Sequence, residues 1–534
     1  MLTKIYSASI NGIEALPVTI ETVITPGIGF SIVGMADQAV RESYQRMTAA
    51  LEQSGFRFPH TRVTVNLSPA DVRKEGASFD LPIAIGLLTA SETLRCDNLG
   101  DYMMMGELSL DGSVLPVKGA LPVAIKAREL GFKKLIVPEG NVTEAAVVNK
   151  LEVYGVKDLA EVAALITGMS DKEPTVINTR ELFAKEFEEF DFDFSEVKGQ
   201  ESVKRAFEVS CAGGHNILMV GPPGAGKSMM AKRLPSILPP LSMAEALETT
   251  KIHSVAGKLN RGSMLMTTRP FRTPHHTVST VALVGGGSNP MPGEISLAHN
   301  GVLFLDEFPE FPRQVLEVLR QPIEDRIITV ARAKYTVNYP ANFMLVASMN
   351  PCPCGYYGHP TKSCSCTPAQ VAKYMNKISG PLLDRIDLQV EIEPVPFDAM
   401  AQTTPAESSA AIRERVMRAR AIQLERYKNL PGIHCNAQMN SRLLREYAWP
   451  DAEGLAKLKE RMEKLNMSAR AFDRILRVAR TIADLDYAAT LPEPSSPDYH
   501  NSVQTAAKTP VLTRHLAEAI GYRSLDRASY GRIF

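Results

Sequence analysis

The sequence has no long hydrophobic run and no excess of charge of either sign. No stretch of about twenty apolar residues occurs, so we expect no membrane-spanning helix and no membrane partner. The first ten residues lack the apolar core of a signal peptide, which predicts a cytoplasmic location. Lysine plus arginine and aspartate plus glutamate both total 59, so any nucleic-acid site must be a local basic patch.

Cysteine is scarce as well, and four of the seven cysteines are clustered in one loop, residues 350–368. The four are Cys352, Cys354, Cys364 and Cys366. In a reducing compartment clustered thiols indicate a metal site rather than disulfides, and four thiolates suit tetrahedral Zn²⁺. A loop rich in Gly and Pro has little core of its own, and a metal would hold its shape. A reduced loop without metal is the alternative, and His359 is a further candidate ligand.

The most informative motif that is present is a complete phosphate-binding loop. It consists of Gly221, Pro222, Pro223, Gly224, Ala225, Gly226, Lys227 and Ser228. The glycines let several backbone N–H groups point at one phosphate chain. We expect Lys227 to neutralise the β- and γ-phosphates and the Ser228 hydroxyl to bind Mg²⁺. An apolar run before the loop and a helical pattern after it favour a true ATP site.

Two later apolar runs end in polar side chains that fit hydrolysis. Residues 301–307 read as a strand that ends in Asp306 and Glu307. We expect Asp306 to hold Mg²⁺ through water and Glu307 to polarise the attacking water. The second run ends at Asn350, which we expect to orient that water or to touch the γ-phosphate. These residues predict hydrolysis of ATP rather than binding alone.

Arg385 and Gln200 are the remaining candidates for contact with the nucleotide. Arg385 lies near a turn, from which a guanidinium could reach the γ-phosphate of a neighbouring subunit and stabilise charge in the transition state. A surface ion pair with Asp384 or Asp387 is the alternative. Gln200 precedes a helix of the kind that often packs against adenine, so we expect it near the base.

A basic hairpin is the one local pattern that points to DNA. The strand-like runs 326–331 and 335–339 flank Arg332 and Lys334. Lysine and arginine at such a tip contact phosphates without reading the sequence, in a manner that depends on salt. An ordinary surface hairpin is the alternative, since basic tips are common.

The pattern of segments predicts an α/β protein of several domains. Residues 1–168 alternate strand-like and helix-like segments, and the polar, acidic residues 169–193 read as a linker. The ATP-binding domain is expected over 194–395, followed by a helical region over 396–534. Within the latter, the sequence predicts a loop at 487–510.

Several stretches resemble the YifB/ComM group of magnesium-chelatase-like AAA+ ATPases, and the resemblance covers nearly the whole chain. The most specific stretches are residues 271–276, 283–287, 292–301, 350–355 and 515–523. In the first of them His275 and His276 are adjacent, and adjacent residues seldom chelate a metal together. We expect a structural or nucleotide-linked role for this pair.

The resemblance implies a role for each candidate residue. It makes residues 221–228 Walker A and the Asp306–Glu307 pair Walker B. It makes Asn350 sensor 1, Arg385 the arginine finger, and Arg470, from the helical lid, sensor 2. It also implies a ring of identical subunits, with six as the expected number and ATP at the subunit junctions. Members of the ComM type are DNA helicases that drive branch migration during natural transformation.

The first domain resembles the Lon-type protease fold found in this group. Ser78 falls on the position of the Lon nucleophile, but Leu121 occupies the position of the lysine that would activate it, and Lys118 is offset. We therefore expect no Ser-Lys proteolysis. A DNA motor is the leading hypothesis. The alternatives are a chelatase-like ATPase that remodels a protein partner and, least favoured, an ATP-dependent protease.

Overall fold

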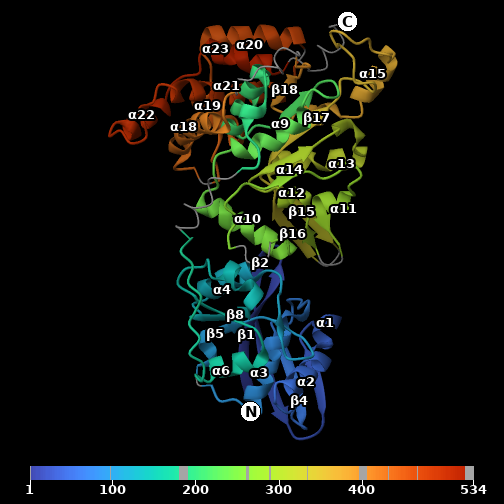
Figure 1. Ribbon diagram of the computed structural model, residues 1–534, viewed down its shortest axis with the longest axis vertical. Coiled ribbons are helices and arrows are strands. Elements are labelled where there is room, and N and C mark those ends of the chain that lie inside the picture. Colours follow the sequence, from blue (N-terminus) through green and yellow to red (C-terminus); the bar gives the residue numbers. More distant parts are fainter. Residues whose placement is uncertain are drawn as a thin grey trace.

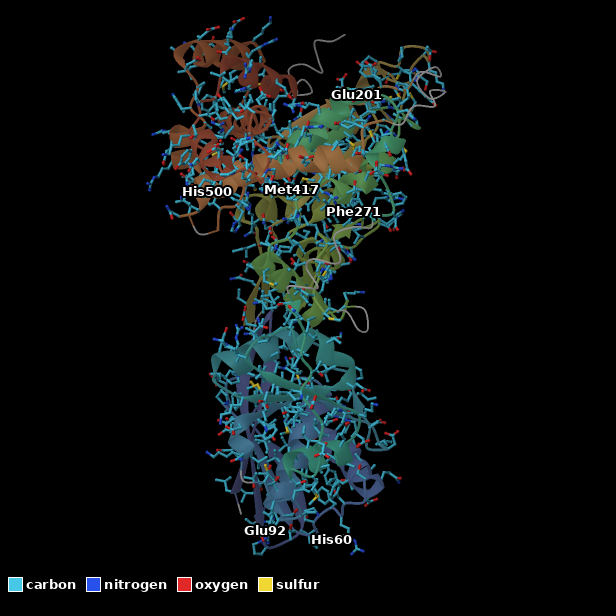
Figure 2. The ribbon with its side chains drawn as sticks, turned by 60° about the vertical axis from the view of Figure 1, so that its left-hand side comes forward. His60, Glu92, Glu201, Phe271, Met417 and His500 are labelled. Atoms are coloured by element: carbon cyan, nitrogen blue, oxygen red, sulfur yellow. The ribbon has the colours of Figure 1, made fainter. Side chains whose placement is uncertain are left out.

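The structure is a computed structural model, and the residues it describes lie in nine ranges. These are residues 2–96, 98–179, 190–259, 264–287, 290–332, 335–395, 406–430, 432–465 and 467–523, without the side chains of Arg332, Tyr335 and Leu465. The molecule is elongated, with the N-terminal sheet at one end and the C-terminal helices at the other (Figure 1). His60 and Glu92 mark the first end, while Phe271 lies in the other half (Figure 2). In the described ranges, no helix combines the length and the apolar character that crossing a membrane requires.

The N-terminal part is built on a seven-stranded mixed sheet in the order β3-β4-β2-β1-β5-β8-β9. Its strands are β1 (Leu2–Asn11), β2 (Glu14–Thr25), β3 (Gly29–Val33), β4 (Arg62–Ser68), β5 (Tyr102–Met104), β8 (Lys134–Pro138) and β9 (Glu152–Val156). A separate short hairpin pairs β6 (Glu107–Leu108) with β7 (Val114–Leu115). Strand β2 pairs antiparallel with both β1 and β4, and the other neighbours are parallel. The sheet therefore combines a hairpin meander with parallel crossover strands.

Helices cover this sheet, and one of them is buried on every side. They are α1 (Gln38–Arg41), α2 (Ser43–Gln53), α3 (Asp80–Ala90), α4 (Ala120–Glu129), α5 (Val142–Ala145) and α6 (Leu159–Ile166). All eleven residues of α3 are buried, as expected of a helix that is apolar all round. Its one charged residue is Asp80, and Arg46 pairs with it at 2.6 Å. The ion pair satisfies a carboxylate that burial would otherwise disfavour.

The second sheet is entirely parallel, in the order β11-β14-β17-β10-β18. Its strands are β10 (Ile217–Val220), β11 (Phe271–Arg272), β14 (Val302–Leu305), β17 (Met344–Met349) and β18 (Leu388–Glu391). The three central strands are buried throughout, which is typical of a parallel sheet covered on both faces. Because parallel strands point the same way, their carboxyl ends meet at one edge, where ligands bind in such sheets.

Helices and two hairpins surround the second sheet. The helices are α8 (Glu201–Gly213), α9 (Lys227–Arg233), α10 (Met243–Ala256), α11 (Thr280–Val284), α12 (Glu294–Leu297), α13 (Arg313–Val318), α14 (Arg320–Asp325), α15 (Pro368–Met375) and α16 (Gly380–Leu383). The hairpins pair β12 (Gly285–Gly286) with β13 (Met291–Pro292), and β15 (Ile327–Arg332) with β16 (Tyr335–Pro340). Helix α10 contacts α4 of the N-terminal part, and Lys251 on α10 pairs with Glu14 at 2.9 Å. This helix thus links the two sheets.

The C-terminal region is helical in the part that the structure describes. Its helices are α18 (Ser409–Tyr427), α19 (Ser441–Tyr447), α20 (Ala452–Leu465), α21 (Ala469–Ala488), α22 (Tyr499–Ala506) and α23 (Thr513–Gly521). Helix α21 packs against α18, α23 and α8. Together with the parallel sheet, this region gives the mixed α/β architecture with a helical C-terminus that the sequence predicts. The predicted loop at 487–510 is wrong in part, because α22 lies within it.

Candidate nucleotide and metal sites

The loop between β10 and α9 has the backbone conformation of an anion cradle. Gly224 and Gly226 have φ angles of 80° and 86°, which L side chains rarely adopt, so both positions favour glycine. Helix α9 begins at Lys227, directly after the loop, and its N-terminus faces the same space. The structure thus gives residues 221–228 the strand, turn and helix that the motif predicts.

The Lys227 ammonium is held by three uncharged oxygens. Its Nζ donates to the carbonyl oxygens of Gly221 at 2.6 Å and Pro222 at 2.9 Å, and to Asn350 Oδ1 at 3.0 Å. Burial lowers the pKa of Lys227. A phosphate oxygen would make a stronger, charge-assisted bond than these neutral acceptors and can replace them. The side chains of Lys227 and Asn350, predicted from separate motifs, are therefore within reach of one ligand.

Ser228 and Asp306, which the sequence predicts to share Mg²⁺, are in direct contact. Ser228 Oγ donates to Asp306 Oδ2 at 2.5 Å, and Ser348 Oγ donates to the other carboxylate oxygen. A hydroxyl and a carboxylate are hard oxygen ligands of the kind that Mg²⁺ prefers. Sequence reasoning missed Ser348. Side chains alternate along a strand, so its position two residues before Asn350 on β17 was the available signal.

Glu307 follows Asp306 in a left-handed conformation, with φ of 53°, and its side chain is exposed. His276 Nδ1 lies 3.4 Å from Glu307 Oε2. The His276 ring also lies against that of His275, with 4.1 Å between the centroids. His276 thus lies beside the predicted catalytic carboxylate, and a structural or nucleotide-linked role of the histidine pair stays a prediction.

Arg385 and Arg470 both approach one carboxylate, that of Glu324. Arg385 Nη2 lies 2.8 Å from Glu324 Oε2, and Arg470 Nε lies 3.8 Å from Oε1. The alternative of a surface ion pair of Arg385 with Asp384 or Asp387 is wrong. Arg385 is buried and pairs with a residue far away in the sequence, while Asp387 is held by Arg474 at 3.0 Å. Sequence reasoning missed Glu324, which had no motif around it.

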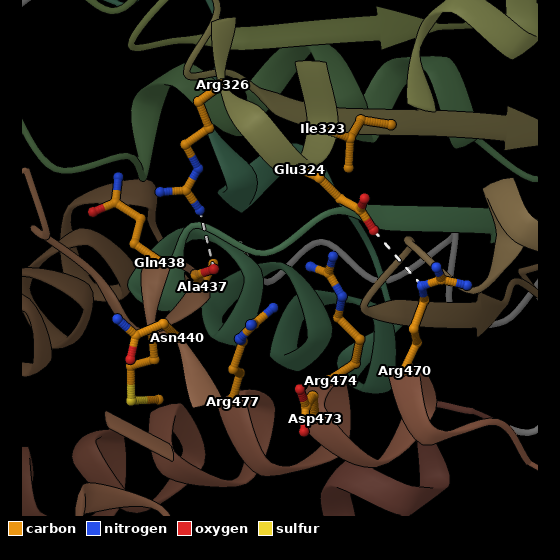
Figure 3. Close-up of a pocket in the computed structure, with 11 residues that line it drawn as sticks. Ile323, Glu324, Arg326, Ala437, Gln438, Asn440, Arg470, Asp473, Arg474 and Arg477 are labelled. Carbon is orange, nitrogen blue, oxygen red and sulfur yellow. Dashed lines mark hydrogen bonds and ion pairs between the residues drawn. The ribbon is translucent and has the colours of Figure 1, made fainter. Parts of the chain in front are cut away.

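A cavity of about 330 Å³ opens beside Glu324, between α14 and α21 (Figure 3). It is lined by Ile323, Glu324, Arg326, Ala437, Gln438, Met439, Asn440, Arg470, Asp473, Arg474 and Arg477. Arg326 donates to the Ala437 carbonyl at 3.0 Å across it. Burial and the charge of Arg474 lower the pKa of Arg477 to about 10. In the described ranges, no hydrogen bond or ion pair joins Arg385 or Arg470 to the phosphate loop of the same chain.

Gln200 lies near the start of the phosphate loop. It has a left-handed φ of 62°, and its Nε2 donates to the Glu393 carbonyl at 2.5 Å. The neighbouring Ile392 N–H donates to the Val220 carbonyl at 2.7 Å, at the end of β10. The expectation of a contact between Gln200 and the base stays a prediction.

The four clustered thiols lie within 4.8 Å of one another. Three Sγ–Sγ distances are 3.3, 3.7 and 3.5 Å, for the pairs 352–354, 352–364 and 354–364. A tetrahedral zinc site with Zn–S bonds of about 2.3 Å has S–S edges of about 3.8 Å, whereas a disulfide measures about 2.05 Å. The thiols interact: the backbone N–H of Tyr356 lowers the pKa of the Cys354 thiol, whereas the pKa values of the Cys364 and Cys366 thiols are raised by burial and by the neighbouring thiols. The donor set and its spacing fit zinc.

The predicted basic hairpin is present as β15 and β16. Ile327 pairs with Pro340 at its base, and Arg332 pairs with Tyr335 at its outer end. Lys334 lies outside the described residues, as does the side chain of Arg332. The contact of these two residues with DNA stays a prediction. The hairpin precedes β17, the strand that Asn350 directly follows.

In the N-terminal part, Ser78, Lys118 and Leu121 are the residues that bear on a Lon-type Ser-Lys pair. Leu121 is fully buried in α4, whereas Lys118 is exposed and lies along Gly257 at the end of α10. In the part of the chain that the structure describes, no hydrogen bond joins Ser78 to a lysine. The geometry gives no support to a Ser-Lys pair.

Comparison with protein families gives three matches that together cover most of the chain. Residues 193–400 match "Magnesium chelatase, subunit ChlI". Residues 20–141 match "Subunit ChlI of Mg-chelatase", and residues 406–495 match "Magnesium chelatase, subunit ChlI C-terminal".

Individual relatives extend over nearly the full length. The uncharacterized protein YifB of Escherichia coli (strain K12) is 41% identical over 533 residues, covering 98% of both chains. The competence protein ComM of Haemophilus influenzae (strain Rd) is 40% identical over 530 residues, again covering 98% of both. The archaeal Lon protease of Thermococcus kodakarensis is 27% identical over 153 residues, which are 27% of this chain and 24% of that protein.

Proposed function

The chain belongs to the family of magnesium-chelatase ChlI-type AAA+ ATPases that includes YifB and ComM, and from this premise we propose that it is an ATP-driven ring motor acting on DNA. The expected product of each turnover is ADP and phosphate. The proposed domains are a Lon-like part over residues 1–168, a linker over 169–193, an ATPase core over 194–395 and a helical lid over 396–534.

The proposed chemistry is in-line attack of water on the γ-phosphate. Glu307 positions the water, and Lys227 and Asn350 bind the γ-phosphate. Ser228 and Asp306 would hold Mg²⁺, which supplies charge stabilisation at the β- and γ-phosphates when it is bound. The contact between Ser228 and Asp306 and the bond between Lys227 and Asn350 support this assignment, because they gather the four groups at one sheet edge.

Arg385 and Arg470 are proposed to act on the nucleotide of a neighbouring subunit. They share Glu324 and have no bond to their own phosphate loop among the described residues. An arginine supplied by another subunit stabilises negative charge on the transferred phosphoryl group and couples hydrolysis to assembly. This arrangement requires a closed ring of identical subunits, with six as the proposed number.

The observation that carries the DNA proposal is the hairpin β15–β16, inserted shortly before β17, the strand that Asn350 follows. In this proposal, a movement of Asn350 on hydrolysis would be transmitted to the hairpin through β17. Arg332 and Lys334 at its outer end would contact phosphates, which requires no sequence readout. The name of the competence protein ComM agrees with a role in DNA handling.

The proposal is tested with a fluorescently labelled four-way DNA junction, Mg²⁺ and ATP. The wild-type protein should convert the junction to forked products, Glu307→Gln should bind without converting it, and Lys334→Ala should bind more weakly. Lys232→Ala is the matched control, because Lys232 is an exposed lysine on α9, outside the hairpin. Failure of the wild-type protein to bind or convert any DNA, with ATP hydrolysis intact, would contradict the proposal and favour remodelling of a protein partner.

A further inference from the structure

The cysteine loop begins where the ATP site ends. Asn350 directly follows β17, and Cys352, which is fully buried, comes two residues later. Residues 351–367 contain no helix or strand, and most of their side chains are exposed or half-buried. Such a segment has little packing of its own, so the four thiols are its main means of keeping a fixed shape.

One residue of this loop packs directly on the phosphate loop. Gly355 has φ of 84°, and its N–H donates to the Cys352 carbonyl at 3.0 Å. A Cβ built on Gly355 would lie 2.6 Å from Pro223 Cδ and 2.9 Å from Pro223 Cγ, closer than side-chain contacts allow. The backbone of the cysteine loop therefore lies against the ring of Pro223, with no space between them.

Pro223 sits in the part of the phosphate loop that holds Lys227. Lys227 Nζ is bonded to the carbonyls of Gly221 and Pro222 on one side and to Asn350 on the other. The cysteine loop thus adjoins the ATP site at two points: it continues the chain after Asn350, and Gly355 supports Pro223. A displacement of the cysteine loop would move both groups that position the lysine.

We propose that the four-cysteine cluster, when it holds zinc, is a support for the phosphate loop, so that metal occupancy sets the affinity of the ATP site for nucleotide. The inference rests on the ATP site of the proposed function and on binding of zinc by the four thiols, but not on any action on DNA. The residues that transmit the effect are Gly355 and Pro223, by contact, and Asn350, by its position in the chain.

The first test measures zinc content by elemental analysis and nucleotide affinity with a fluorescent ATP analogue. The purified wild-type protein should hold one zinc per chain. Removal of zinc with a chelator, followed by return of Mg²⁺, should weaken nucleotide binding about tenfold, since small displacements of binding groups have large effects. Added Zn²⁺ should restore the affinity. A zinc-free protein that binds nucleotide as tightly as the loaded protein would overturn the proposal, as would four thiols that bind no zinc.

The second test uses two alanine variants in the same loop to separate the contact between Gly355 and Pro223 from the binding of zinc. Gly355→Ala should keep its zinc and bind nucleotide about tenfold more weakly, because the new Cβ displaces Pro223. Gly358→Ala is the matched control: Gly358 has a similar φ of 74°, but a Cβ there meets nothing within 4 Å. Equal affinity of the two variants would overturn the proposal. Neither readout involves DNA, so failure of the motor function would leave this test unaffected.

Discussion

At the scale of single residues, the predicted catalytic carboxylates are each positioned by a polar neighbour. Asp306 accepts hydrogen bonds from Ser228 and Ser348, and Glu307 lies beside His276. Side chains with such neighbours are held in one orientation, which matters more for hydrolysis than for binding, because attack requires aligned atoms. We therefore propose that His276 positions the Glu307 carboxylate.

Replacement of His276 by alanine should lower the kcat for ATP hydrolysis about tenfold and leave KM unchanged. Among the described residues, His276 is the one side chain that pairs with the Glu307 carboxylate, so Glu307 loses this contact while the groups that bind the phosphates stay in place. Steady-state hydrolysis over a range of ATP concentrations measures both constants. His276→Asn is the informative control, since its amide nitrogen can occupy the position of Nδ1 and should restore part of kcat. An unchanged kcat in His276→Ala would show that the contact has no catalytic role.

Short motifs made part of the site predictable from the sequence. Lys227 and Ser228 lie within eight consecutive residues, where local spacing alone fixes their geometry. Glu324, Ser348 and the contact between Gly355 and Pro223 were not predictable in this way. Each depends on segments far apart in the sequence that meet only after folding, and no local pattern encodes such a meeting.

At the scale of helices and strands, α21 carries two groups of charged residues with different contacts. Its first turn carries Arg470, which approaches Glu324, and its later turns carry the fully buried Asp484. Arg426 from α18 and Arg480 pair with Asp484 at 2.6 and 3.0 Å. Burial alone would raise the pKa of Asp484, but the two guanidiniums outweigh it and hold the pKa below its usual range. One buried carboxylate thus joins α18 to α21 in the helical C-terminal region.

Asp484→Asn should destabilise the lid by about 3–5 kcal/mol, because it leaves two buried guanidiniums without their counter-ion. The single tryptophan, Trp449, reports on this region, since its ring lies 5.9 Å from that of Phe472 on α21. Thermal unfolding followed by Trp449 fluorescence measures the effect. Glu453→Gln is the control: it removes a surface pair with Lys457, which is worth at most about 1 kcal/mol.

The ion pairs of Asp484 with Arg426 and Arg480 also make the stability of the protein depend on pH. Because the folded-state pKa of Asp484 is lowered, its stabilisation is fully present above the unfolded-state pKa, about 4, and is lost as pH falls through the folded-state value. The difference in melting temperature between wild type and Asp484→Asn should therefore shrink below about pH 4. Equal melting temperatures at pH 7 would contradict the stabilisation expected from these ion pairs.

Elements were predictable to different degrees. Strands β10, β14 and β17 are apolar runs followed directly by motif residues, so their positions followed from the pattern, whereas their order in the sheet did not. Helix α22 was missed. It has eight residues after a Pro- and Ser-rich stretch, too few turns for a helical period to stand out, and only packing against α18 and α21 fixes it.

At the scale of the whole molecule, the role proposed for Arg385 and Arg470 requires a second copy of the chain. The phosphate loop, with Lys227, and the arginine pair, Arg385 and Arg470, have no bond to each other in the described ranges. The family to which the chain belongs and this separation together favour a site completed by a second copy. The outer end of the β15–β16 hairpin would then be repeated around the ring, where several copies can hold one DNA strand.

The most direct test of the DNA motor is the ATP hydrolysis rate of the purified full chain, with and without single-stranded and forked DNA. We expect DNA to stimulate hydrolysis and Glu307→Gln to abolish it. In Lys334→Ala the basal rate should persist while the stimulation by DNA is lost, and Lys232→Ala should behave as wild type. Hydrolysis that is abolished by Glu307→Gln but unchanged by any DNA would contradict the proposed DNA motor and favour action on a protein partner.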